Sequence, residues 1–230
     1  MKPRISCIIP AYNEEQRIEK VLKIVTQHSL LKEVIVINDG STDKTLEIIQ
    51  KFKTVIVINQ EKSLGKSQAV LAGLKKASGE IILFLDADLV GLTEENLTNL
   101  VKPVINNEID VAISLIKNTT WFAKLIGIDY LSGQRAIKKH FLDDFLKISK
   151  IPGWGIESAY LNEKIINQNL TLKVVLWENV TSPWPQKKFG YIQGQIRLIK
   201  MVWEILSFNG FFHSIFQIFK MWQIKNHYQN

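Results

Sequence analysis

The chain has 230 residues, of which 46% are hydrophobic and 22% are charged, values that are ordinary for a globular protein and exclude a disordered one. It contains one cysteine and four histidines, which excludes a zinc site of the usual spacing. The net charge is +7, and from Thr181 onward six Lys or Arg residues stand against one acid, Glu204, so the basic excess is mostly C-terminal.

The first ninety or so residues alternate predicted strands with predicted helices. Apolar runs predict strands at Ile5 to Ile9, Val34 to Ile37, Val55 to Ile58 and Ile81 to Leu85. Helical spacing of apolar residues predicts helices at Ile18 to Val25, Leu46 to Phe52 and Ala69 to Ala77. Asn13 is expected to cap the first of these helices, with Gln16 reaching back. The alternation β-α-β-α-β-α-β predicts a parallel sheet with right-handed crossovers.

The pattern is looser in the second half of the chain. We expect a helix from a Thr93 cap through Val104, a strand at Asp110 to Ser114, a helix from Gly133 to Phe145, another helix opening at Gly153 to Glu157, and a late strand at Leu172 to Trp177. From Tyr191 the sequence is helical and rich in Trp, Phe and Ile, with a break at Asn209-Gly210. The start of the sequence shows no signal-peptide pattern, and no run reaches the ~20 apolar residues of a membrane span.

Two carboxylates, Asp86 and Asp88, follow the strand that ends at Leu85. Residues at the carboxyl edge of a buried parallel strand face the crevice where open α/β sheets bind ligands. An aspartate pair there can hold a hard divalent cation and leave positions for phosphate oxygens. The alternative is that Asp86 caps a helix and Asp88 is a solvated loop residue. A second polar turn, Asn38 to Asp43, can hydrogen-bond a ribose or a base edge.

Two other enzyme classes fit parts of this pattern. Gly65-Lys66-Ser67 ends like a phosphate-binding P-loop, but that motif needs glycine where this chain has Gln60. The run from Asp86 to Val90 also fits the nucleophile motif of haloacid-dehalogenase-like phosphatases, with Asp143-Asp144 as a second metal pair. In those enzymes the nucleophile strand normally opens the domain, whereas here three predicted strands precede it.

Four segments together resemble the nucleotide-sugar half of a family 2 glycosyltransferase with the GT-A fold. They are Ile9 to Glu15, Asn38 to Asp43, Gly65-Lys66 before a helix, and Asp86-Ala87-Asp88. The resemblance is specific across residues 4–115. It is weaker from Ser132 to Gly190, where Ser132-Gly133-Gln134-Arg135-Ala136, Gly155-Ile156-Glu157 and a basic Lys187-Lys188-Phe189-Gly190 resemble the dolichyl-phosphate mannosyltransferase branch.

The resemblance implies a fold and a set of site residues. The fold is a Rossmann-like, mostly parallel α/β sheet flanked by helices and followed by C-terminal amphipathic helices. The nucleotide-sugar would be bound by Pro10, Tyr12, Glu14, Asp39, Lys66, Asp86 and Ala87. Asp86 and Asp88 would hold Mg²⁺ or Mn²⁺, Asp88 and Glu157 would act in catalysis, and Arg135 and Trp154 would lie on the acceptor side. A solvated acid at the start of a helix is the alternative for Glu157.

The chain departs from the family pattern in two places. Many inverting members carry Glu-Asp where this chain has Glu157-Ser158, which leaves the acceptor base and the stereochemistry open. The tail lacks the Gln/Arg-x-x-Arg-Trp motif of processive polymerases, which indicates non-processive transfer. We expect a catalytic domain at 1–190, with a nucleotide-sugar half at 1–115 and an acceptor half at 116–190, followed by an amphipathic helical segment at 191–230.

The expected function is metal-assisted transfer of a sugar from a UDP- or GDP-linked donor to a lipid-phosphate or small acceptor. The expected location is the cytoplasm, with a peripheral position at the inner face of the membrane open, and no nucleic-acid partner is expected. The amphipathic tail fits either helices in a membrane interface or helices that cover the core of the catalytic domain. Two alternatives remain beside the transferase: the phosphatase with Asp86 as nucleophile, and a membrane-surface binding module on an inactive transferase scaffold.

Overall fold

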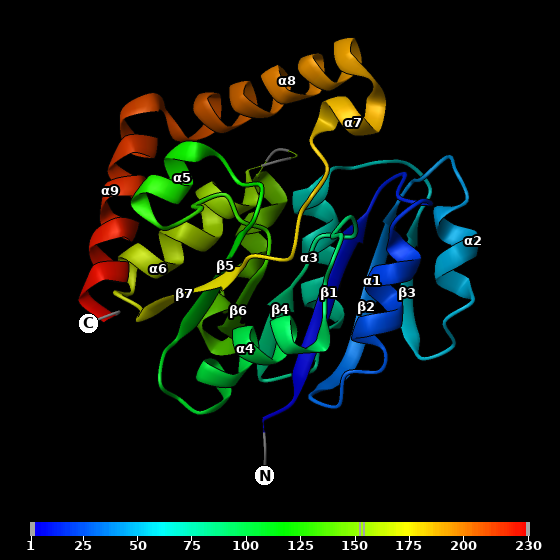
Figure 1. Cartoon of the computed structure of the whole chain (residues 1–230), viewed down its shortest axis with the longest axis horizontal. Helices are drawn as coiled ribbons and strands as arrows, with labels where there is room; N and C mark the ends of the chain where they lie inside the picture. The colour runs from blue at the N-terminus through cyan, green and yellow to red at the C-terminus, as the bar shows by residue number, and fades with distance from the viewer. Residues whose placement is uncertain (1–2, 152, 154, 229–230) are drawn as a thin grey trace.

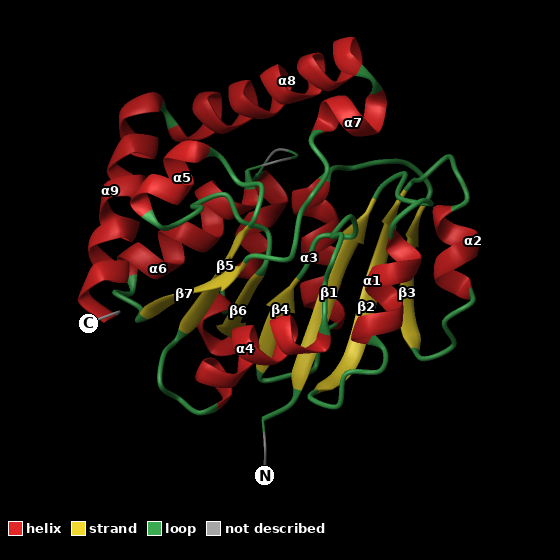
Figure 2. Cartoon of the chain, in the orientation of Figure 1, coloured by secondary structure: helices red, strands yellow, loops and turns green. Residues whose placement is uncertain are grey.

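The strands form one seven-stranded sheet in the order β3-β2-β1-β4-β6-β5-β7 (Figures 1 and 2). The structure is a computed structural model, and it describes residues 3–151, 153 and 155–228. The strands are β1 Ile5–Ala11, β2 Leu31–Asp39, β3 Val55–Gln60, β4 Ile81–Phe84, β5 Val111–Ile116, β6 Arg135–Lys138 and β7 Leu172–Trp177. β6 pairs antiparallel with β4 and β5, while the other neighbouring strands pair parallel. The predicted mostly parallel sheet is confirmed.

Helices cover both faces of this sheet. They are α1 Ile18–Val25, α2 Thr45–Gln50, α3 Lys66–Lys76, α4 Glu94–Ile105, α5 Trp121–Ile126, α6 Glu163–Asn167, α7 Pro185–Phe189, α8 Tyr191–Asn209 and α9 Phe211–Tyr228. Short 3₁₀ helices at Lys139–Leu142 and Phe145–Lys150 and a π-helical segment at Glu157–Asn162 complete the described elements. The break predicted at Asn209-Gly210 separates α8 from α9, where Gly210 has φ +77°.

The core consists of two apolar layers, one on each face of the sheet. Successive residues of a strand point to opposite faces, so Ile8 and Ile35 pack in one layer while Cys7 and Val34 pack in the other. The first layer lies under α3 and the second under α1 and α4. Cys7 is fully buried, and burial raises the pKa of its thiol, which confirms it as a core residue.

The carboxyl ends of β1, β2 and β4 meet at one edge of the sheet, the upper edge in Figure 1. Asp39 ends β2, and Asp86 and Asp88 follow β4, so the topology brings the predicted carboxylates to this edge. α7 and α8 pass over the same edge (Figure 1). The edge lies where open α/β sheets bind ligands.

The expected helix from Gly133 to Phe145 is wrong, because its first part is strand β6. Ala136 pairs with Leu83 of β4 and with Ala112 of β5, so this segment fills the gap between two strands. A short buried apolar run cannot be told from a helix by periodicity alone. The pairing partners that decide the matter are distant in sequence.

The expected capping role of Asn13 is also wrong. Asn13 has φ +55°, and its side-chain Oδ1 accepts a hydrogen bond of 2.8 Å from the backbone N–H of Thr42. Its own N–H donates to Ser41 Oγ at 3.0 Å. Asn13 therefore joins the turn after β1 to the turn after β2, and α1 begins later, at Ile18. The capping role predicted for Thr93 is confirmed, since its side chain accepts from Asn96 N–H in a capping box.

Asp110 joins three strands at the opposite edge of the sheet. Its Oδ2 accepts from the Thr171 N–H at 3.0 Å and from Thr171 Oγ1 at 2.8 Å, and its Oδ1 pairs with Lys138 Nζ at 3.2 Å. Partial burial alone would raise the pKa of Asp110, but the bonds from Thr171 and Lys138 outweigh it and hold that pKa below its ordinary value.

We predict that Asp110→Asn lowers the free energy of unfolding by about 1 kcal/mol at pH 7, because hydrogen bonds to a charged group are lost. Because the pKa of Asp110 is lowered in the folded protein, the charged carboxylate stabilises the fold at pH values above its ordinary pKa, near 3.9. This contribution is lost as the pH falls through the pKa of the folded state. Urea unfolding between pH 7 and pH 2 should show the difference between the two proteins shrinking below about pH 4. Glu61→Gln, a change at an exposed acid, is the control and should be neutral. A difference that is constant with pH would contradict the assignment.

Candidate active site

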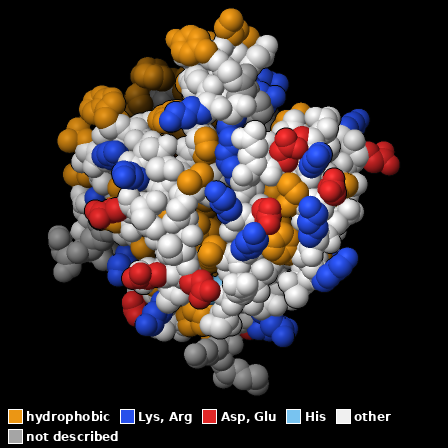
Figure 3. Space-filling model, turned by 45° about the vertical axis from the view of Figure 1, so that its right-hand side comes forward, with side chains coloured by type: hydrophobic (Ala, Val, Ile, Leu, Met, Phe, Trp, Pro, Cys, Tyr) orange, Lys and Arg blue, Asp and Glu red, His pale blue; other side chains and the backbone are white. Residues whose placement is uncertain are grey.

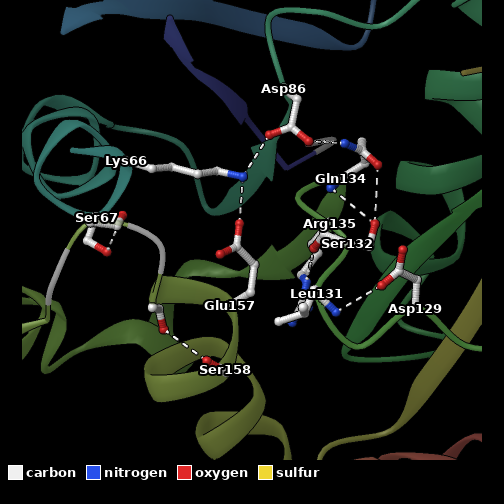
Figure 4. A network of polar contacts seen from close by, with 12 residues as sticks. Lys66, Ser67, Asp86, Asp129, Leu131, Ser132, Gln134, Arg135, Glu157 and Ser158 are labelled. Carbon is white, nitrogen blue, oxygen red and sulfur yellow. Dashed lines mark hydrogen bonds and ion pairs between the residues drawn. The ribbon is translucent and has the colours of Figure 1, made fainter. Parts of the chain in front are cut away.

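The centre of the candidate site is a lysine between two carboxylates. Lys66 Nζ lies 2.8 Å from Asp86 Oδ1 and 2.6 Å from Glu157 Oε1 (Figure 4). Gln134 Nε2 donates to the other oxygen of Asp86. Burial alone would lower the pKa of Lys66, but the two carboxylates hold it above its ordinary value. The lysine is therefore charged, and it holds Glu157 close to Asp86, which follows β4.

Close backbone approaches assemble this cluster. A Cβ at Gly133 would lie 2.5 Å from Asp86 Oδ1, so a larger residue in the loop before β6 would displace this carboxylate. Gly65, with φ +92°, precedes Lys66 at the start of α3, and a Cβ there would lie 2.8 Å from Gly153 Cα. The Ser67 N–H donates to the Gly153 carbonyl at 3.0 Å. These contacts bring α3 to the segment that leads into Glu157.

A second lysine bridges a second pair of carboxylates. Lys188 of α7 pairs with Asp88 Oδ2, and its Nζ lies 2.6 Å from Glu14 Oε1. Ser182 Oγ donates to Asp88 Oδ2 at 2.9 Å, and Arg17 pairs with Glu14 Oε2 at 3.2 Å. Burial raises the pKa of Glu14, whereas Asp88 and Glu14 raise the pKa of Lys188 against the effect of its burial. This pair ties the turn after β1, the end of β4 and α7 together.

One oxygen of Asp88 is left over in this arrangement. In the described part of the chain, Asp88 Oδ1 is buried and has no hydrogen-bond partner. Among the same residues there is no group of three His, Cys, Asp or Glu side chains that could hold a metal. A hard cation bound here would take Asp88 Oδ1 and complete its shell with phosphate oxygens and water, as Mg²⁺ commonly does. The residues present fit such an ion, and Asp88 is the better ligand because both oxygens of Asp86 are engaged.

The predicted nucleotide-binding residues lie in separate places. Pro10, Lys66 and Asp86 line one narrow cavity, together with the predicted catalytic residue Glu157. Tyr12 is partly exposed, and its ring centroid lies 6.0 Å from the Arg197 guanidinium carbon of α8. Glu14 faces Lys188 as described above, and Ala87 is buried between the two aspartates.

Asp39, at the end of β2, orders the loop that leads into α3. Its carboxylate accepts from Leu64 N–H at 2.8 Å, from Gly65 N–H at 3.0 Å and from Ser63 Oγ at 2.8 Å. Asp39 is 4% exposed. Three of about four acceptor positions of the carboxylate are used, which leaves capacity for one bond to a ligand.

The predicted acceptor side lies partly beneath the site. Arg135 is 1% exposed, and its guanidinium donates to the Ser132 and Tyr130 carbonyls, both at 2.7 Å, and to Asn162 Oδ1 at 2.6 Å. Burial lowers the pKa of Arg135 to about 10. Arg135 thus fixes the loop that contains Tyr130 and Ser132 and leads into Gln134 (Figure 4). Trp154, the other residue predicted for the acceptor side, lies outside the described residues.

The polar residues that contact Asp86 and Asp88 without having been predicted are Gln134, Ser182 and Lys188. Gln134 and Lys188 belong to segments that carried the family resemblance, so a signal for both was present. Ser182 precedes Pro183 in a loop without a motif, and the contact to Asp88 is visible only in the fold.

The aspartates of the rival phosphatase pattern do not come together with Asp86. Asp144 pairs with Lys147 at 2.7 Å and with Lys164, and it accepts from Tyr160 at 3.0 Å. The contacts of Asp86 go to Lys66 and Gln134. The structure therefore gives no support to a second metal pair at Asp143-Asp144.

Comparison with known proteins places the chain in a family. The model of the family described as Glycosyl transferase family 2 matches residues 6–165. Among similar curated proteins are a dolichyl-phosphate beta-glucosyltransferase of Trichomonas vaginalis, 34% identical over 122 residues (44% of this chain, 37% of that protein), and a dolichol-phosphate mannosyltransferase of Pyrococcus furiosus, 33% identical over 135 residues (54% of this chain, 38% of that protein). The matches thus span well under half of either relative.

The fold is also found among solved structures. Glucosyl-3-phosphoglycerate synthase from Mycobacterium tuberculosis, in complex with Mn²⁺, uridine-diphosphate-glucose and phosphoglyceric acid, has a TM-score of 0.68 to this chain at 24% identity. The likeness covers 89% of this chain and 79% of that one and shows a shared GT-A fold. Because the family model matches more than half of the sequence, the chain belongs to glycosyl transferase family 2.

Proposed function

We propose that the chain transfers a single sugar from a UDP- or GDP-linked donor to a lipid-phosphate or small acceptor, with Mg²⁺ or Mn²⁺ bound. The observation that carries the proposal is the buried Oδ1 of Asp88, which has no hydrogen-bond partner among the described residues. It lies at the carboxyl edge of the sheet, beside two lysine-bridged carboxylate pairs. Two similar proteins are named for dolichyl- or dolichol-phosphate as acceptor, and the similar solved structure holds UDP-glucose and Mn²⁺. Their names support a lipid-phosphate acceptor here.

The residues of this chain supply binding, orientation and charge. Tyr12, Glu14 and Asp39 surround the nucleoside position, and Pro10, Ala87 and the Lys66–Asp86 pair shape the pocket for the sugar. Asp88, with Asp86 beside it, would hold the ion, which would neutralise the charge that develops on the departing diphosphate. Lys188, which pairs with Asp88, would place a further positive charge next to that diphosphate, and Lys66, which pairs with Asp86, would keep this carboxylate oriented for the sugar.

Glu157 is proposed to meet the acceptor. It is 4% exposed, and Lys66 at 2.6 Å fixes its orientation, unlike a solvated acid in the first turn of a helix. For a hydroxyl acceptor Glu157 would receive the proton. A phosphate acceptor is already ionised, so there Glu157 would position rather than deprotonate. Arg135 and Trp154 remain proposed for the acceptor side, Arg135 through the loop that it supports.

The proposed location is the cytoplasm at the inner face of a membrane, where a lipid-phosphate acceptor would be met. Among the helices of the described residues none is long and apolar enough to cross a bilayer.

The paired carboxylates at the site favour a working enzyme over a binding module on an inactive scaffold.

We predict that donor binding depends on the metal. Titration calorimetry should show UDP- or GDP-sugar binding more tightly with Mn²⁺ than with EDTA, and donor at 100 times Kd should add about 2.7 kcal/mol to the free energy of unfolding. UMP and GMP, which lack the diphosphate, serve as controls and should depend less on Mn²⁺. Equal donor affinity with Mn²⁺ and with EDTA would refute the metal-bridged diphosphate.

We predict that Asp88→Asn lowers transfer, or hydrolysis of the donor, by about a hundredfold or more, the typical cost of one lost electrostatic element. The rise in Tm on adding Mn²⁺ should also disappear, because the amide is a weaker ligand. Asp143→Asn is the matched control: Asp143 is exposed, and a transferase should tolerate its change, whereas the phosphatase would lose activity. Full Mn²⁺-dependent turnover by Asp88→Asn would exclude the metal role of this residue.

We predict that Lys66→Met lowers the free energy of unfolding by roughly 3 to 5 kcal/mol, because two buried carboxylates lose their shared cation. Adding Glu157→Gln to this variant should restore part of the loss, since one uncompensated charge is removed. Urea unfolding of the two single variants and the double variant measures the coupling. Additive effects of the two changes would show that the ion pair does not hold the site together.

A further inference from the structure

The C-terminal helices turn an apolar face away from the rest of the protein. Seven large hydrophobic side chains of α8 are exposed: Tyr191, Ile192, Ile196, Ile199, Val202, Trp203 and Phe208. On the opposite side of the same helix Gly194 and Ile205 are buried against the domain. α8 is the uppermost element in Figure 1, and Figure 3 shows hydrophobic side chains gathered along that rim.

α9 continues the pattern after the break at Gly210. Its exposed large hydrophobic residues are Phe211, Phe212, Ile215, Phe216, Phe219 and Trp222. The other side of α9 is anchored, because Gln217 is fully buried and donates to the Ser158 carbonyl at 2.9 Å, and His213 lies 2.7 Å from Glu163. The exposed apolar face is therefore held outward by specific contacts on the inner side.

A helix of the catalytic domain extends this surface. On α5, Trp121 is 76% exposed and Leu125 is 74% exposed, with Phe122 between them at 43%. Lys225 of α9 donates to the Ile126 carbonyl of α5 at 3.0 Å, so the two helices are in contact. We call the exposed apolar residues of α5, α8 and α9 together the apolar helical surface.

The charges beside this surface are almost all positive. α8 and α9 carry Arg197, Lys200, Lys220 and Lys225 and one acid, Glu204, whose carboxylate lies 3.8 Å from Lys200 Nζ. Lys187 precedes them on α7, and Lys124 lies on α5. Tryptophan and phenylalanine beside lysine are typical of helices that lie in the headgroup region of a bilayer, and lysines there are attracted to anionic lipids.

We propose that the apolar helical surface docks on an anionic lipid bilayer, with α5 of the catalytic domain as part of the contact. The occupant is a membrane rather than an acidic protein because the exposed face is a broad run of aromatic and aliphatic side chains bordered by lysines. α8 begins three residues after Lys188, which pairs with Asp88, and Arg197 of α8 lies over Tyr12. Docking would bring the site next to the lipid surface.

The proposal does not depend on the transfer chemistry, so it can fail while the transferase proposal stands. The test is flotation of the 230-residue chain with vesicles of phosphatidylcholine alone and with vesicles that also contain about 30% phosphatidylglycerol. We expect binding to the anionic vesicles that weakens with salt. Trp203→Gln with Phe212→Gln, and separately Trp121→Gln with Leu125→Gln, should each weaken it at least about tenfold without changing the net charge.

Two controls separate the surface from general effects. Leu146→Gln, at a residue 60% exposed outside the three helices, should bind as the unchanged protein does. Lys200→Gln with Lys220→Gln should weaken binding about thirtyfold, whereas Lys32→Gln with Lys53→Gln, which removes the same charge at exposed sites elsewhere, should change it little. Tm measurements check that every variant is folded.

Three results would overturn the proposal. The first is no flotation of the unchanged protein with anionic vesicles at low salt. The second is an equal loss of binding for both lysine pairs, which would leave only net charge as the cause. The third is a dimer in light scattering that Trp203→Gln with Phe212→Gln dissociates, because a second copy of the chain would then be the occupant.

Discussion

The site depends on the pairing of buried carboxylates with lysines that come from distant parts of the chain. Lys66 joins Asp86 to Glu157, and Lys188 joins Asp88 to Glu14. Carboxylates gathered at one edge of the sheet would repel each other and resist burial without such partners. In the proposed function the same lysines would provide positive charge next to the diphosphate, so one arrangement would serve both stability and ligand binding.

The sheet places these pairs through its strand order. β4 lies between β1 and β6, which puts Asp86 next to the loop before β6 and within reach of Gln134. Glycine at position 133 leaves room for that approach, since a Cβ would lie 2.5 Å from the carboxylate and displace it. The antiparallel strand β6 thus does more than fill the sheet: it brings the second half of the chain against the first half.

The C-terminal helices connect the site to the outside of the molecule. α7 supplies Lys188 to Asp88, and α8 places Arg197 over Tyr12 on its inner side while its apolar residues face outward. The structure thus shows that the tail covers part of the domain, and the interpretation of its outer face as a membrane interface stays a proposal. A narrow inner face packs on the domain, and the broad apolar face that the sequence pattern indicated is the exposed one.

Local pattern was enough to determine most of the strands and helices, the Thr93 cap, the break at Gly210 and the carboxylate pair after β4, because each is encoded by residues close together in sequence. The family resemblance rested on the same short segments. The partners of those carboxylates were decided only by the tertiary structure, since Lys188 and Ser182 reach Asp88 across about a hundred residues. The strand β6 could not be predicted from the sequence either, because it is defined by its pairing with β4 and β5. The role of Asp39 in ordering a loop depends on the path of residues 63–65 in the fold, which only the tertiary structure decided.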